Sequence, residues 1–143
     1  MYAVDQIEVT LTVPSVEETA AWYERVLGWV AQFDAFDAEG QCVFGSVSRR
    51  SNDASDQDAF KGFNLSRSSS GAPKMNTNSC RGISIWVFVN SVKEVYERVV
   101  DSDARPDSIP KDQPWGGRLF RMRDLNGLKL TFVEMPRQRS EPA

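Results

Sequence analysis

Val13-Pro14-Ser15-Val16 followed by Tyr23-Glu24-Arg25-Val26 is the stretch that decides the fold, because it returns as Val89-Asn90-Ser91-Val92 followed by Tyr96-Glu97-Arg98-Val99. An alternating apolar segment precedes each copy. A repeat of roughly 75 residues is too long for a solenoid unit and too short for two large independent domains. The repeat therefore predicts two strand–helix modules packed into one domain, with a ligand surface between them.

The composition is that of an ordinary globular protein. The chain has 143 residues, of which 41% are hydrophobic and 26% charged, and this suffices for one domain with a real core. No apolar run approaches the ~18 residues of a membrane span, and the first residues lack the pattern of a signal peptide. We therefore expect a cytoplasmic protein without membrane contact, in which Cys42 and Cys80 are free thiols.

Charge is unevenly distributed along the chain. The net charge of −3 disfavours nucleic acid as a partner. Residues 1–75 carry a net charge of −5 and residues 76–143 a net charge of +2. The acidic half is compatible with a cationic ligand or a basic partner. The simpler alternative is two solvated faces of unequal sign.

The first module is expected to contain four strands and one helix. Strict alternation from Ile7 to Val13 predicts a half-buried strand over 6–13. Ser15, with Glu18 three residues later, is typical of a helix N-terminus, and Gly28 is typical of a helix end. Further strands are expected over 29–36, 41–48 and 60–65.

The second module repeats this order after a linker rich in Ser, Gly and Pro. Its expected elements are strands over 83–89, 118–123 and 128–134, a helix over 91–100 and a long loop over 101–117. The expected organisation is a single domain, 1–135, with module one at 5–66, a linker at 67–81, module two at 82–135 and a flexible tail at 136–143.

The two ends of this region resemble a known family. The run from Val9 through Pro14 and Ser15 to Gly28 resembles the opening of the vicinal oxygen chelate superfamily, which contains glyoxalase I, bleomycin resistance protein and extradiol dioxygenase. Trp115-Gly116-Gly117-Arg118 with Asp124-Leu125-Asn126-Gly127 resembles its end. The resemblance implies an α+β fold in which two βαβββ modules form a curved mixed sheet around a cleft, often completed in a homodimer.

The resemblance also implies where a metal would bind. Metal-dependent members take one ligand, usually His or Glu, from each of four strands, and the matching positions here are Glu8, Asn64, Ser84 and Thr131. One carboxylate, two hydroxyls and an amide are a poor donor set for a catalytic divalent ion. The chain has no histidine to serve as ligand or base. We therefore expect no metal and no cofactor, and we assign no catalytic residue.

The polar candidates for ligand binding begin on the first strand. Glu8 and Thr10 lie on the side of that strand opposite the apolar residues, so Glu8 is expected to point into the cleft and to orient a cationic group. The simpler alternative is a solvated strand residue. Asn64, Ser84 and Thr131 join the candidate lining through the family positions.

The aromatic and cationic candidates lie in the second module. Trp86 and Phe88 share the face of Ser84 and suit stacking on a planar ligand, or packing against the other module or a dimer partner. Trp115 is expected to be a lid over the cleft or a plain loop anchor. Arg121 shares a face with Arg123 and suits a carboxylate or phosphate clamp; the alternative is exposed charge on an edge strand.

The preferred function is metal-free binding or sequestration of a small organic molecule, of the drug-resistance type. One alternative is an enzyme of glyoxalase or dioxygenase type with an atypical metal site or none. Another is a partner-binding module whose cleft is vestigial. Whether the protein is an enzyme is left open, with the weak donor set favouring a binding protein.

Overall fold

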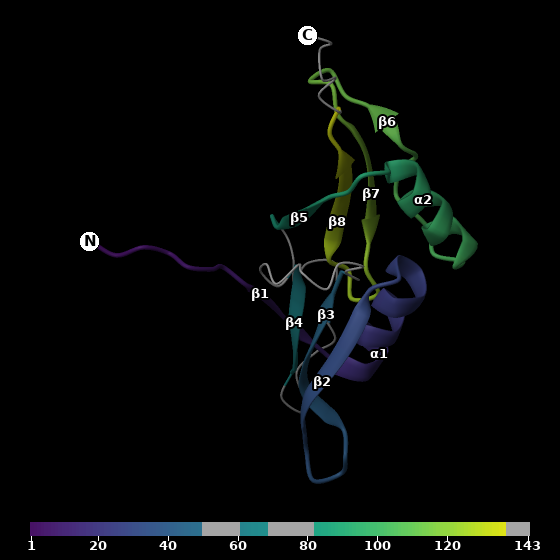
Figure 1. Cartoon of the computed structure of the whole chain (residues 1–143). Helices are drawn as coiled ribbons and strands as arrows, with labels where there is room; N and C mark the ends of the chain where they lie inside the picture. The colour runs from purple at the N-terminus through teal and green to yellow at the C-terminus, as the bar shows by residue number, and fades with distance from the viewer. Residues whose placement is uncertain (50–60, 69–81, 137–143) are drawn as a thin grey trace. The chain divides into compact units, whose positions relative to one another are not determined.

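The chain divides into two compact units, Met1–Met75 and Asn76–Ala143. The computed structural model describes residues 1–49, 61–68 and 82–136. Each unit holds a four-stranded mixed sheet with its own helix, and the strands follow the same order in both (Figure 1). The predicted α+β fold of two βαβββ modules is confirmed. That the two sheets enclose one cleft stays a prediction.

The first module is built on the sheet order β1-β4-β3-β2. β1 runs parallel to β4, whereas β3 is antiparallel to both β4 and β2. The helix contacts β2, β3 and β4. Its elements are β1 (Val9–Val13), α1 (Val16–Trp22), the π-helical turn η1 (Tyr23–Leu27), β2 (Val30–Phe36), β3 (Cys42–Ser48) and β4 (Gly62–Arg67).

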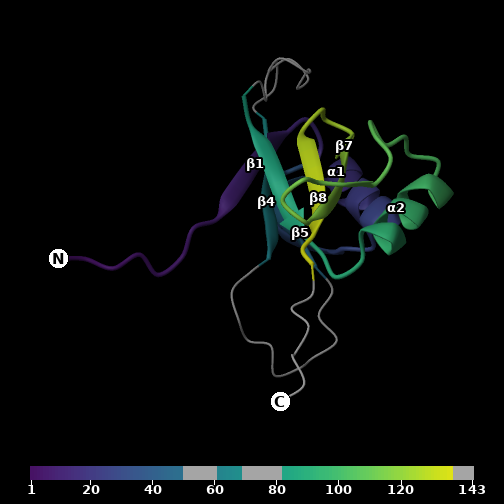
Figure 2. The same ribbon diagram turned by 90° about the horizontal axis from the view of Figure 1, so that it is seen from above.

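The second module repeats this topology in the order β5-β8-β7-β6. β5 is parallel to β8, and the remaining pairs are antiparallel. Helix α2 lies against β7 and β8 (Figure 2). The elements are β5 (Ser84–Phe88), α2 (Val92–Asp101), β6 (Lys111–Asp112), β7 (Arg118–Arg123) and β8 (Lys129–Glu134).

Both helices begin where the sequence predicts. The hydroxyl of Ser15 accepts a hydrogen bond from the amide of Glu18 at 3.1 Å, and Ser91 accepts one from Glu94 at 3.2 Å. These bonds satisfy one free amide in each first turn. The first helix ends at Gly28, whose φ of 72° is left-handed.

Three predictions of secondary structure are wrong beyond shifts of one residue. β1 starts at Val9 rather than residue 6, and the side chain of Ile7 is 85% exposed. β4 extends to Arg67, two residues beyond the predicted strand. The short strand β6 interrupts the region predicted as a long loop. The predicted linker beyond Ser68, Cys80 and the tail from residue 137 lie outside the described residues.

Each module has a core of its own. In the first, the fully buried Tyr23 contacts the rings of Trp22, Trp29 and Phe63. In the second, Phe120 and Phe132 stack with ring centroids 5.2 Å apart, and Tyr96 of α2 packs edge-on against Phe120 at 5.4 Å. The helix therefore covers the face of the sheet to which Phe120 belongs.

One type of turn closes the hairpin β2–β3 and the hairpin β7–β8. In each, an aspartate that opens the turn accepts two backbone amide hydrogen bonds through one carboxylate oxygen, at 2.8–2.9 Å. A glycine with left-handed backbone stands three residues later. The turns span residues 37–41 and 124–128, with Asp37 and Gly40 in the first and Asp124 and Gly127 in the second.

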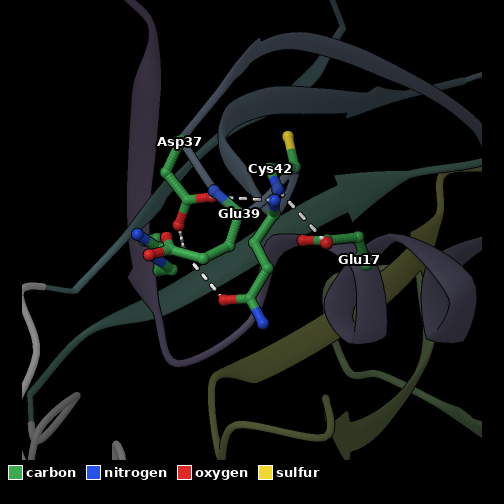
Figure 3. A network of polar contacts seen from close by, with 6 residues as sticks. Glu17, Asp37, Glu39 and Cys42 are labelled. Atoms are coloured by element: carbon green, nitrogen blue, oxygen red, sulfur yellow. Dashed lines mark hydrogen bonds and ion pairs between the residues drawn. The ribbon is translucent and has the colours of Figure 1, made fainter.

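The turn of the first module has an additional ion pair. A guanidinium nitrogen of Arg67 lies 2.8 Å from the second carboxylate oxygen of Asp37 and also donates to the side-chain oxygen of Gln41 at 3.0 Å. Close by, the amide of Cys42 donates to the carboxylate of Glu17 on α1 (Figure 3). These contacts tie the end of β4 and the start of α1 to the β2–β3 hairpin.

Acid is expected to weaken this turn. The amide of Gln41, followed by Arg67, lowers the pKa of Asp37 below its ordinary value. Because the native pKa is the lower one, the ionised carboxylate stabilises the fold above the unfolded pKa, and this contribution is lost as pH falls through the native pKa. Asp37→Asn should therefore be less stable than wild type at pH 7, and the difference should shrink at pH 3, as measured by urea denaturation.

Asp5→Asn is the control, because it removes the same charge from an exposed residue of the same module. It should leave stability unchanged at both pH values. An equal deficit of Asp37→Asn at pH 7 and pH 3 would contradict the role assigned to the ionised carboxylate.

Candidate functional site

The open face of module two, meaning the face of β5, β8 and β7 opposite α2, carries most of the predicted ligand-binding residues. Strand register arranges the side chains of this face in three rows across the sheet. The rows are Ser84–Lys129–Arg123, Trp86–Thr131–Arg121 and Phe88–Val133–Leu119. The open face therefore changes from polar and cationic in the first row to apolar in the third, where Val133 and Leu119 are buried.

A hollow of about 420 Å³ lies over the first two rows. This volume lies within the range of small-molecule sites. Its lining comes from β5, β7, β8 and one residue of the loop before β6: Ser84, Trp86, Asp107, Arg121, Met122, Arg123, Lys129, Leu130 and Thr131. The structure thus brings together four of the predicted site residues, namely Ser84, Trp86, Arg121 and Thr131.

The charged residues described in the lining are mostly cationic. The guanidinium of Arg123 lies 3.7 Å from the carboxylate of Asp107, the single acid among the described residues that line the hollow. Arg121 and Lys129 are exposed, and neither forms an ion pair within the described part of the chain. The hollow therefore holds two positive charges that no acid of the described residues offsets in an ion pair.

An aromatic cluster borders the hollow. The rings of Trp86 and Trp115 stack with centroids 6.4 Å apart and planes inclined by 28°, and Phe88 lies 6.4 Å from Trp86 along the strand. The side chains of Trp86 and Trp115 are 46% and 48% exposed. The Trp115 ring occupies the space that a Cβ on Gly117 would need. Trp115 therefore extends the aromatic surface from the loop before β7.

Two hydroxyls lie in the lining of the hollow. The Oγ of Ser84 is 3.4 Å from the Oγ1 of Thr131, and Thr131 is almost fully buried. Thr131 lies between Trp86 and Arg121 in the second row, and its short side chain leaves space above the sheet between these two long side chains.

The candidates of module one are arranged differently. Thr10 pairs with Asn64 in the parallel ladder of β1 and β4, in the position that Trp86 and Thr131 occupy in β5 and β8. Glu8 precedes β1 and is exposed. Glu8 therefore lies one residue outside the strand, and its expected orientation into a cleft stays a prediction.

Comparison with known proteins decides the family. The family model of the Glyoxalase/Bleomycin resistance protein/Dioxygenase superfamily matches residues 4–132, which is most of the chain. This chain belongs to that superfamily. A search of curated proteins found no match.

Solved structures share the superfamily fold. A glyoxalase-related enzyme from Clostridium phytofermentans superposes with a TM-score of 0.74 at 22% identity, over 94% of this chain and 98% of that one. TioX from Micromonospora sp. ML1 gives 0.64 at 22% identity, over 95% and 100%. A bleomycin resistance determinant encoded on the transposon Tn5 gives 0.66 at 20% identity, over 94% and 100%. At these identities the likeness shows the fold alone.

The metal positions of the superfamily do not fit a catalytic divalent ion in this member. Ser84 and Thr131 offer neutral hydroxyls, Asn64 offers an amide, and Glu8 alone offers a carboxylate. Such ions need several imidazole, thiolate or carboxylate ligands. No group of three such residues that could hold a metal ion occurs in residues 1–49, 61–68 and 82–136.

The described helices include none long and apolar enough to cross a membrane.

The predicted site residues did not include five residues of the lining in this superfamily member, namely the charged Asp107, Arg123 and Lys129 and the apolar Met122 and Leu130. Two of them follow from alternation, since Lys129 lies two residues before Thr131 and Arg123 two after Arg121. The short strand β6 pairs with β7 at Leu119 and Arg118 and not at Arg121 or Arg123, so the edge-strand alternative for these arginines stays a prediction. Asp107 has no such signal, since it reaches the hollow from a loop.

Proposed function

We propose that this protein binds a small organic molecule, without a metal ion, on the open face of module two. The observation that carries the proposal is a hollow of about 420 Å³ directly beside the half-exposed indole of Trp86. Ligand sites in proteins combine such a concave surface with aromatic lining and a few polar groups. The weak donor set at the superfamily metal positions favours binding over metal catalysis.

The relatives support the same proposal at the level of the family. One structure with this fold is a bleomycin resistance determinant, so the fold occurs in a protein associated with resistance to a small molecule. Sequestration of a drug or metabolite is the corresponding role proposed for this chain. A homodimer and a cytoplasmic location stay predictions.

Calorimetric titration of the full chain with a panel of planar organic molecules, anionic, neutral and cationic, tests the proposal. At least one compound should bind, and Trp86→Ala should weaken its binding about tenfold or more, because loss of ring stacking removes most of the contact. Phe36→Ala is the matched control, since it removes an exposed aromatic ring of β2 in the other module.

Two results would contradict the proposal. One is the absence of binding by every compound of the panel. The other is binding that disappears after treatment with a chelator and returns with a divalent cation, which would favour the enzyme alternative with an atypical metal site.

A further inference from the structure

We infer that the hollow of module two selects a planar aromatic molecule that carries an anionic group. The ring lies against Trp86, and the anionic group is held by Arg121 with help from Lys129. This inference rests on the proposed function and adds the chemical class of the ligand.

The charges that line the hollow indicate the charge of its ligand. Asp107 is already engaged by Arg123, so the two remaining cations face the hollow without an acidic partner in the described residues. A cationic ligand would meet repulsion from both, whereas a carboxylate would compensate them. The ligand charge that suits this hollow is thus opposite to the one that the acidic first half of the sequence indicates.

The register of the strands indicates how far the anionic group lies from the aromatic ring of the ligand. Trp86, Thr131 and Arg121 occupy one row across three adjacent strands. Neighbouring strands lie about 4.8 Å apart, so the backbones of Trp86 and Arg121 are about 10 Å apart. A fused aromatic ring on the indole can therefore direct a carboxylate along the row towards the guanidinium, over the short Thr131 side chain.

The side chains at this end of the row are of the kind that binds a carboxylate. An arginine guanidinium presents a planar fork that binds a carboxylate through two parallel hydrogen bonds. Lys129 stands in the neighbouring row as a second point charge. Ser84 and Thr131 place two hydroxyls nearby, and the hydroxyl that accepts in their mutual hydrogen bond keeps its proton to donate to the same anion.

Calorimetric titration with 2-naphthoate, its neutral isostere 2-naphthamide and the non-aromatic cyclohexanecarboxylate tests the inference on the full chain. Naphthoate should bind at least tenfold more tightly than either comparison compound, and its affinity should fall with added salt. Arg121→Gln should weaken naphthoate about tenfold or more, and Lys129→Gln should weaken it less, because a point charge lacks the bidentate fork.

Arg118→Gln is the matched control, because it makes the same change on the same strand but on the opposite face, where Arg118 lies 4.0 Å from Asp112. It should leave naphthoate affinity unchanged. Thermal melting of each variant confirms that the module is folded.

The outcomes separate this inference from the proposed function. Equal affinity for naphthoate and naphthamide would overturn the anion site while leaving small-molecule binding in place. Equal weakening by Arg121→Gln and Arg118→Gln would overturn the role of the hollow. If naphthoate does not bind but another compound of the wider panel does, the inference is wrong and the proposed function stands.

Discussion

Replacing Phe120 with alanine is expected to lower the free energy of unfolding of the second module by about 3–5 kcal/mol. Phe120 is fully buried, stacks on Phe132 and meets Tyr96 of α2 edge-on. The substitution removes the ring that joins the helix to the sheet and leaves a cavity that its rigid neighbours cannot fill. Urea denaturation followed by circular dichroism measures the loss.

Phe88→Ala is the matched control for this prediction. Phe88 is in the same module but is 62% exposed, so its loss should cost no more than about 1 kcal/mol. Equal costs for the two substitutions would show that the Phe120 contacts do not hold the module together.

Gly62→Ala is expected to destabilise the first module by about 3 kcal/mol. A Cβ at this position would meet the carbonyl oxygen of Val47 and would lie 2.6 Å from the Cα of Ser48, both backbone atoms of β3. Backbone cannot move aside as a side chain can, so β4 must shift away from β3 at the point where they pair. Thermal melting and hydrogen exchange of the β3–β4 amides measure the effect.

Gly40→Ala separates this clash from the general effect of replacing glycine. Gly40 has a left-handed backbone but open space around its Cβ position, so alanine there should cost only about 1–2 kcal/mol. If Gly62→Ala were as mild as Gly40→Ala, the close approach of β3 and β4 at this point would be refuted.

Much of the fold could be predicted because local signals repeat. Ser15 and Ser91 mark both helix starts, and Asp124 with Gly127 marks the last hairpin, since each of these residues acts on backbone a few positions away. Alternation likewise places Trp86 and Phe88 on one face. Contacts within one turn or one strand depend on short stretches of sequence, and such stretches can be interpreted alone.

The missed features depend on partners distant in sequence. Residues 6–8 alternate like a strand, yet the ladder between β1 and β4 starts only at Val9 opposite Phe63, and a strand requires a hydrogen-bonded neighbour. The lining of the hollow depends in the same way on which strands adjoin. Lys129 becomes part of a cationic site only because β8 lies between β5 and β7.

The parallel pairing of β1 with β4 and of β5 with β8 has a consequence for folding kinetics. Val9 meets Phe63 and Ser84 meets Lys129, so each pairing closes a loop of roughly fifty residues, whereas each aspartate turn closes its hairpin within five. The hairpins are thus expected to assemble early and the two parallel strands to dock late. Trp86 lies on β5, one of these late strands. The aromatic side of the hollow would therefore form only late in folding.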